Sequence, residues 1–182
     1  MNYHLVSLFL LFNINTMLAQ KMILEHFQSS PKLQWRIIND GVMGGLSNSQ
    51  IIISSEGYGL FKGSISLDNN GGFASTRGIL STPIQQKATT IKIRVKGDGK
   101  KYSFRIQSTS NYRVSYKLDF STNANSWEEI ELPLKDFIPT WRGRILSGVP
   151  PIVATDIDQI GFLISDKQEG AFELLIDWIM LM

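Results

Sequence analysis

The chain has 182 residues, with 18 Lys and Arg against 16 Asp and Glu, and no window gathers the basic residues that a phosphate backbone needs. It contains no cysteine, which excludes disulfides, thiolate chemistry, Cys-ligated metals and the lipid-anchored cysteine of a lipoprotein. The hydrophobic share of 43% is ample for one packed core. We therefore expect one globular domain that does not bind nucleic acid.

The first twenty residues differ from the rest of the chain. They contain no Lys, Arg, Asp or Glu, and residues 5–12 form an apolar run that only Ser7 interrupts. This pattern predicts a signal peptide over residues 1–19, cleaved after Ala19, and a single domain over residues 20–182. The run is shorter than the roughly 20 apolar residues of a membrane span. We expect an exported protein, periplasmic or secreted, if the leader is cleaved and a cytoplasmic one otherwise; an extra strand or a disordered leader is the alternative.

Two glycine-rich loops lie in the first half of the domain. Residues 39–47 include Asp40, Met43 and three glycines, and residues 68–77 end at Arg77. Glycine tolerates positive φ and close backbone approach, so the geometry of such loops matters. The first loop does not match a phosphate-binding spacing, and no nucleotide site is expected. It either satisfies turn geometry, with Asp40 capping its own amides, or it binds a partner.

Period-two alternation, the mark of half-buried strands, dominates the chain after residue 20. Early strands are expected at residues 33–38, 50–54 and 58–67, with Phe61, Ile65 and Leu67 on one face of the third. Residues 91–95 alternate next, and Tyr102, Phe104 and Ile106 then oppose Ser103, Arg105 and Gln107. The turn at residues 97–99 predicts a hairpin between these two runs, with residues 114–120 as a third arm.

Later strands are expected at residues 127–132, 159–165 and 171–181. The last of these is apolar on both faces, so it should run through the middle of a sheet. Helical spacing is confined to about one turn at residues 134–137. Nine or ten short strands with almost no helix predict an all-β fold, an antiparallel β-sandwich of jelly-roll type.

Arginines and one tryptophan are the strongest functional lead. Arg77 follows the second glycine-rich loop, and Trp141 precedes Arg142 and Arg144. Arginine recognises anions through two parallel hydrogen bonds, and tryptophan offers a stacking face for a sugar or a peptide side chain. The alternative is an arginine–carboxylate bridge that pins loops together through Asp40, Asp136 or Asp166. We also expect one end or face of the sandwich to gather the following set: Asp40, Met43, Asn48, Arg77 and Arg144.

Catalytic and metal sites find little support in the sequence. Outside the leader the one histidine is His26, where a surface or sheet-edge role is the ordinary explanation. Asp156 and Asp158 would share a strand face, but Ca²⁺ needs six to eight oxygen ligands from converging loops. No carboxylate pair is selected for glycoside hydrolysis. We predict no catalytic residue, no metal and no cofactor.

An ordered series of motifs resembles one known family. The residues that carry the resemblance are Trp35, 40–47, 61–63, 71–77, 96–99, Tyr102, Trp127, 132–137, 142–144, 160–162 and 170–174. In this order they are similar to the complex I intermediate-associated protein 30 family, from about residue 24 to the end. The resemblance implies a galactose-binding-like jelly roll and, for mitochondrial members, assembly of respiratory NADH:ubiquinone oxidoreductase. The N-terminus differs from the Arg-rich leader of those members.

Three functions follow as hypotheses. The first is a non-enzymatic protein-interaction module, similar to an assembly factor or chaperone, with a protein partner and at most a peripheral contact with a membrane. The second is a carbohydrate-binding module that stacks a sugar on Trp141 beside Arg142 and Arg144. The third, ranked last, is a hydrolase that uses acidic residues. The tentative binding residues are Asp40, Met43, Asn48, Arg77, Trp141, Arg142 and Arg144.

Overall fold

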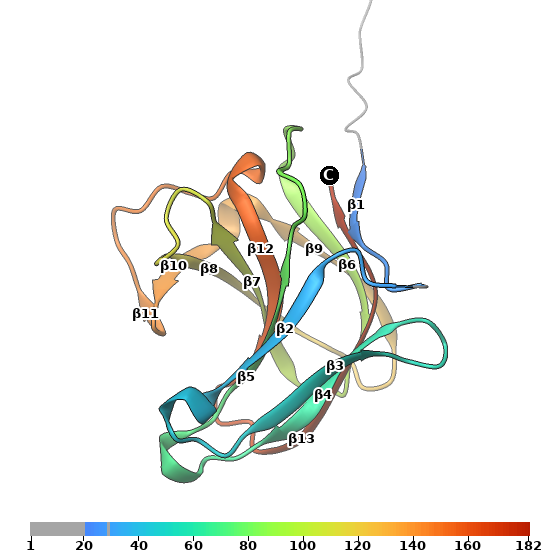
Figure 1. Cartoon of the computed structure of the whole chain (residues 1–182), viewed down its shortest axis with the longest axis vertical. Coiled ribbons are helices and arrows are strands. Elements are labelled where there is room, and N and C mark those ends of the chain that lie inside the picture. The colour runs from blue at the N-terminus through green and yellow to red at the C-terminus, as the bar shows by residue number, and fades with distance from the viewer. Residues whose placement is uncertain (1–20, 29) are drawn as a thin grey trace, which may run out of the picture.

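A computed structural model describes residues 21–28 and 30–182, and the predicted signal peptide lies outside them. Two antiparallel sheets form a sandwich (Figure 1). The six-stranded sheet has the order β3 (Asn48–Ile53), β4 (Gly59–Ile65), β13 (Gly170–Leu181), β6 (Thr90–Lys96) and β9 (Trp127–Pro133), with β1 (Met22–Glu25) paired to β13. The seven-stranded sheet has the order β11 (Arg144–Ile145), β10 (Ile138–Trp141), β8 (Ser115–Ser121), β7 (Lys101–Ser108), β12 (Ile157–Ile164), β5 (Ala74–Ile79) and β2 (Gln34–Asn39).

In the part of the chain that the structure describes, the helices are four short 3₁₀ helices, η1 (Asp40–Met43), η2 (Asp68–Asn70), η3 (Leu134–Asp136) and η4 (Ala154–Asp156). The predicted helical turn at residues 134–137 corresponds to η3. Within the described residues, no helix is long and apolar enough to cross a membrane. The prediction of an all-β, antiparallel β-sandwich is confirmed.

The core lies between the inner faces of the two sheets. Ile91, Ile93 and Val95 point inward from β6 and are fully buried, as their alternation predicts. From the other sheet Phe104 packs edge-on against Phe162 with ring centroids 5.2 Å apart. These two rings lie on neighbouring strands of the same sheet, and such aromatic pairs bury a large apolar area within the core.

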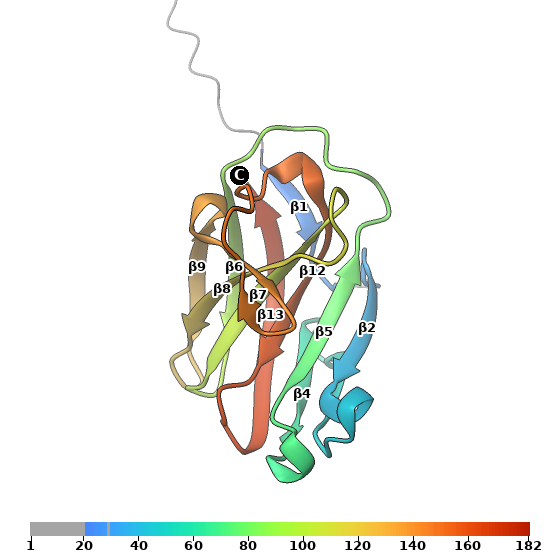
Figure 2. The same cartoon turned by 90° about the vertical axis from the view of Figure 1, so that its left-hand side faces the viewer.

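The final strand is central, as its two apolar faces predict. β13 pairs with β6 on one side, and with β4 and then β1 on the other. The register Met22↔Leu181 brings the first described strand beside the C-terminus at one end of the sandwich (Figures 1 and 2). At the opposite end η1 and η2 lie side by side in both views.

The predicted hairpin between residues 91–95 and 102–106 is wrong, because β6 and β7 belong to different sheets. The turn at residues 97–99 instead carries the chain across the edge of the sandwich. The Asp98 carboxylate accepts hydrogen bonds from the Tyr102 hydroxyl at 2.9 Å and from the Glu173 backbone amide at 3.0 Å, which ties the crossing to both sheets. The third arm is correctly placed, since β8 pairs with β7.

Three other local predictions are corrected. Residues 74–77 belong to strand β5 and not to the second glycine-rich loop. β10 and β11 form a hairpin where no strand was expected. Leu67 does not share the buried face of Phe61 and Ile65, because β4 ends at Ile65 and Leu67 is 36% exposed.

Candidate functional site

Asp40 joins the two glycine-rich loops. Its side chain is buried, and it accepts hydrogen bonds from the Ser47 backbone amide at 3.0 Å and from the Ser47 hydroxyl. The backbone amides of Gly72 and Phe73 also donate to it, at 2.7 and 3.3 Å. Burial alone would raise the pKa of the Asp40 carboxyl, but these hydrogen bonds outweigh burial and lower the pKa. Asp40 therefore accepts bonds from loop amides, as expected, and is fully used in holding the loops together.

Of the other residues expected beside Asp40, Met43 and Asn48 lie at the same end of the sandwich, whereas the two arginines lie elsewhere. Asn48 begins β3 and is exposed on the six-stranded sheet. Met43 ends η1, and its side chain lies outside the described residues. The Arg77 guanidinium donates to Gln107 Oε1 at 2.8 Å and not to Asp40. Arg144 lies on β11, at the opposite edge of the seven-stranded sheet from β2 and Asp40. Arg77 and Arg144 therefore do not share a site with Asp40 as expected.

Trp141, Arg142 and Arg144 do lie together, on the β10–β11 hairpin. Trp141 pairs with Arg144 in register, and the turn between them has positive φ at Arg142 (48°) and Gly143 (78°), as a two-residue hairpin turn requires. The Arg142 guanidinium lies 5.1 Å from the centroid of the Trp141 ring. Trp141 is 43% exposed. None of the ion pairs in the described part of the chain links these arginines to Asp40, Asp136 or Asp166.

His26 and the adjacent Glu25 take part in hydrogen bonds that hold the segment between β1 and β2 in place. The adjacent Glu25 is completely buried and accepts hydrogen bonds from the backbone amides of Lys32 and Leu33, each at 3.0 Å, and from the Trp35 indole at 2.9 Å. The His26 backbone amide also donates to Glu25, and His26 Nδ1 accepts a bond from the Gln28 amide. Sequence reasoning considered His26 and overlooked Glu25, because nothing in the sequence marks a buried carboxylate.

The two aspartates weighed as calcium ligands lie in different elements. Asp156 ends η4, and Asp158 lies on β12. The Asp158 carboxylate accepts a hydrogen bond from Gln159 Nε2 at 3.1 Å. Among residues 21–28 and 30–182, no group of three or more His, Asp or Glu side chains is arranged to hold a metal ion.

A row of arginines crosses the outer face of the seven-stranded sheet. Arg36 on β2 lies opposite Arg77 on β5, and Arg77 lies opposite Gly161 on β12. Gly161 in turn lies opposite Arg105 on β7. Residues that oppose each other in an antiparallel sheet share a face, so all three arginines point to the same side. We call Arg36, Arg77 and Arg105 the arginine row.

The hydrogen-bond partners of the arginine row are neutral. Arg36 donates to Gln159 Oε1 at 2.9 Å and Arg77 to Gln107 Oε1 at 2.8 Å. Arg105 donates to the hydroxyls of Ser115 at 2.8 Å and Thr140 at 3.3 Å. Among the described residues, no ion pair includes an arginine of the row. These side chains are thus held in place without neutralisation of their charge.

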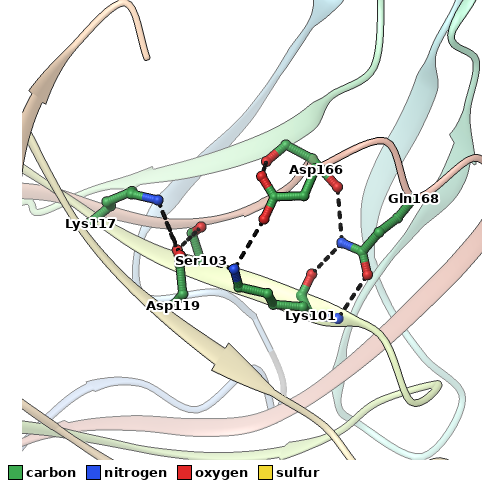
Figure 3. A network of polar contacts seen from close by, with 7 residues as sticks. Lys101, Ser103, Lys117, Asp119, Asp166 and Gln168 are labelled. Carbon is green, nitrogen blue, oxygen red and sulfur yellow. Dashed lines mark hydrogen bonds and ion pairs between the residues drawn. The ribbon is translucent and has the colours of Figure 1, made fainter. Parts of the chain in front are cut away.

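The next cation along this face of the sheet, Lys117, forms an ion pair. Lys117 lies opposite Arg105, but its ammonium group contacts the Asp119 carboxylate at 3.1 Å. Figure 3 shows that Asp119 also contacts Ser103 and Lys101, and that Lys101 reaches Asp166 at 3.1 Å. The network therefore neutralises the lysines beside the arginine row, and its carboxylates form no ion pair with the row.

The charges within the arginine row repel one another. Burial lowers the pKa of Arg77, and the neighbouring Arg36 charge lowers it further. Burial and then the charge of Arg77 lower the pKa of Arg105 to about 10, with Asp119 acting in the opposite direction. Both side chains remain protonated at neutral pH. Like charges directly opposite each other in a sheet are destabilising, so the arginine row lowers the stability of the folded domain.

Sequence reasoning found only part of this surface. The alternation in β7 places Arg105 on the polar face, and Arg77 was singled out. The strand order that aligns them was not predictable, because β2, β5 and β7 are far apart in the sequence and meet through β12.

The six-stranded sheet carries a shallow groove of about 660 Å³ on its outer face. Asn48 and Asp98 line it, together with Lys62 and Glu173, which oppose each other in register. Its charged lining residues are Lys62 and the carboxylates Asp98 and Glu173, so the groove has no excess of positive charge, in contrast to the arginine row.

The model of the family described as complex I intermediate-associated protein 30 matches residues 25–176. The chain belongs to this family. The mouse mitochondrial protein of that name is 33% identical over 96 residues, which are 50% of this chain and 29% of the mouse protein. The probable mitochondrial homologue of Caenorhabditis briggsae is 25% identical over 175 residues, 84% of this chain and 52% of the relative. The chain thus spans about half or less of these relatives.

Solved structures of carbohydrate-binding modules share the fold of this family member. The family 11 module of a Clostridium thermocellum cellulase superposes with a TM-score of 0.64 at 18% identity, covering 90% of this chain and 95% of the module. A family 29 module gives a TM-score of 0.57 at 8% identity, covering 90% of this chain and 92% of that one. At these identities the likeness establishes the galactose-binding-like sandwich alone.

Proposed function

We propose that this domain is a non-catalytic interaction module that assists the assembly of a protein complex. The outer face of the seven-stranded sheet serves as its binding surface. The observation that carries the proposal is the arginine row, in which three aligned guanidinium groups are held by neutral partners. The name of the mitochondrial relatives, complex I intermediate-associated protein 30, supports a protein partner.

The arginine row lowers the stability of the free domain, because its like charges repel one another. Residues that break a local rule without compensation within the fold are typically functional. Arginine is also enriched at the centres of protein interfaces, where its planar group makes several hydrogen bonds at once. A partner that supplies acceptors would convert this repulsion into favourable contacts.

Site-specific photo-crosslinking in the source cells tests the proposal. A photoreactive side chain at Leu163, beside the arginine row, is compared with one at Gln50 on the outer face of the other sheet. We expect one protein to crosslink from Leu163 and not from Gln50, and the purified pair to bind in vitro. Absence of a specific protein adduct from Leu163, or equal yield from both positions, would overturn the proposal.

A carbohydrate-binding function is the second candidate, and the β10–β11 hairpin favours it. Trp141 is 43% exposed and could stack on a sugar ring, although Arg142 covers part of one face. Glycan-array binding that disappears in Trp141→Ala would support this function. Lack of binding across a broad array, or binding that Trp141→Ala leaves unchanged, would exclude the hairpin as a sugar site.

We also propose that the protein is exported after cleavage behind Ala19. The apolar, uncharged leader supports this localisation. Cell fractionation with N-terminal sequencing tests it. A mature chain that begins at Gln20 in the exported fraction is expected, whereas an intact chain in the cytoplasm would contradict export.

A further inference from the structure

We infer that the arginine row binds the carboxylate side chains of an extended acidic segment of the partner protein. This inference rests on the proposed function and specifies the chemistry of the partner. Clusters of arginine are a recurrent means of recognising acidic motifs, since each guanidinium group can hold a carboxylate through two parallel hydrogen bonds.

The spacing of the row suits an extended peptide. From β2 through β5 and β12 to β7 there are three strand intervals of about 4.8 Å, so Arg36 and Arg105 lie on the order of 14 Å apart along the face. In an extended chain, residues i and i+4 are separated by about 13.6 Å and point to the same side. Acidic residues at i, i+2 and i+4 therefore match the length of the row.

Gly161 adds no side chain to the row. It occupies the register position between Arg77 and Arg105 and has no side chain, so no group on β12 separates the two guanidinium groups. The outer face has a slight depression here, too narrow to admit a water molecule, which is lined by Arg77, Arg105, Gln107, Ser115 and Gln159. A carboxylate lying over this depression would face both arginines. The amides of Gln107 and Gln159 are already bonded at both ends within the protein, so the arginines and not the glutamines would hold the ligand.

The residues around the row favour a peptide over a glycan. On one side the adjoining register row contains Ile38, Ser75 and Leu163, and on the other it contains Ile79, Gln159 and Gln107. These side chains are aliphatic, hydroxyl or amide groups, which suit the apolar and backbone groups of a peptide. No aromatic ring occupies these register positions in the described strands, whereas sugar sites usually provide one for stacking.

Fluorescence anisotropy with a defined probe tests the inference. The probe is a labelled nine-residue peptide of alternating Glu and Leu, and a Gln–Leu peptide is its neutral counterpart. The full chain is compared with Arg77→Gln/Arg105→Gln and with Lys62→Gln/Lys96→Gln, a control that loses the same charge on the other sheet. Arg36→Gln, at the exposed end of the row, provides a second variant that leaves the buried positions intact.

We expect the wild type to bind the Glu–Leu peptide, with weaker binding at high salt. The double arginine variant should lose affinity by about tenfold or more, Arg36→Gln by a smaller factor, and the lysine control by less than about twofold. The thermal midpoint of the double arginine variant should be unchanged or raised, because substitution removes repulsion between like charges. A lowered midpoint shared by both arginine variants would instead assign the row a structural role.

Other outcomes overturn the inference in distinct ways. Equal binding of the Gln–Leu peptide would show that charge is not recognised. Binding of oligogalacturonate in place of the peptide, with the same loss in the arginine variants, would make the row an acidic-glycan site. If the protein crosslinked from Leu163 binds the double arginine variant as tightly as the wild type, the inference fails while the proposed function stands.

Discussion

Asp40 and Glu25 are buried carboxylates that form no ion pair with any described residue, and hydrogen bonds from neutral donors stabilise both. The arginine row shows the reverse distribution, because its charges have neutral partners but remain partly open to solvent. At the scale of single residues, the carboxylates are therefore committed to the fold. The arginines are available for a ligand.

Replacement of Asp40 by Ala should lower the free energy of unfolding by about 3 kcal/mol, because buried loop amides lose their acceptor. Asp68→Ala is a matched control in the adjacent loop, since Asp68 is exposed and should change stability by less than about 0.5 kcal/mol. Urea unfolding measures both. Similar midpoints for the two variants would show that Asp40 does not hold the loops together.

The stability of the domain should fall in acid through Glu25. Burial would raise the pKa of Glu25, but hydrogen bonds from Lys32, Leu33 and Trp35 outweigh it and lower the pKa. Because the pKa is lower in the folded than in the unfolded chain, the stabilisation is present above the unfolded value of about 4.3 and is lost as pH falls through the folded value. Urea midpoints between pH 7 and pH 3 measure this loss.

Glu25→Gln is the test of that assignment. It should be less stable than the wild type at pH 7, and the difference should shrink toward pH 3, where the wild-type carboxylate becomes protonated. The exposed Glu169→Gln should follow the wild-type curve. A constant difference between Glu25→Gln and the wild type at every pH would contradict the role given to the Glu25 charge.

At the scale of elements, β12 determines how the arginines align, because it lies between β5 and β7. A Cβ atom at Gly161 would lie 2.0 Å from the Thr76 carbonyl oxygen on β5. Gly161→Ala should therefore push the two strands apart and cost about 2 kcal/mol of stability. Gly41→Ala, where the added atom meets nothing within 4 Å, is the control. Equal thermal midpoints for the two variants would show that a methyl group at residue 161 does not push β5 and β12 apart.

The same elements show how far the sequence could predict the structure. Alternation correctly placed the buried faces of β6 and β7, because side-chain direction in a strand depends only on local period. It could not show that residues 97–99 cross between sheets, since both a hairpin and a crossing satisfy the alternation. Arg77 was identified as a candidate from its neighbourhood in the sequence. Its alignment with Arg36 and Arg105 depends on long-range pairing that no local pattern encodes.

At the scale of the whole molecule, the two outer faces of the sandwich differ in charge. The six-stranded sheet pairs its cations, as in the contacts of Lys92 with Glu129 and of Arg94 with Asp177. The arginine row on the seven-stranded sheet has no such compensation within the described chain. A net charge of +2 thus conceals one locally cationic face, which accounts for an interaction surface in a domain of nearly balanced composition.

Mapping the bound face by NMR tests the central claim most directly. The ¹⁵N-labelled protein is titrated with the Glu–Leu peptide, and amide shift changes are assigned to residues. We predict that the changes cluster at Arg36, Arg77, Arg105 and Gly161, on the outer face of the seven-stranded sheet. Changes confined to the groove near Asn48 and Glu173, or to the hairpin of Trp141 and Arg144, would contradict the account.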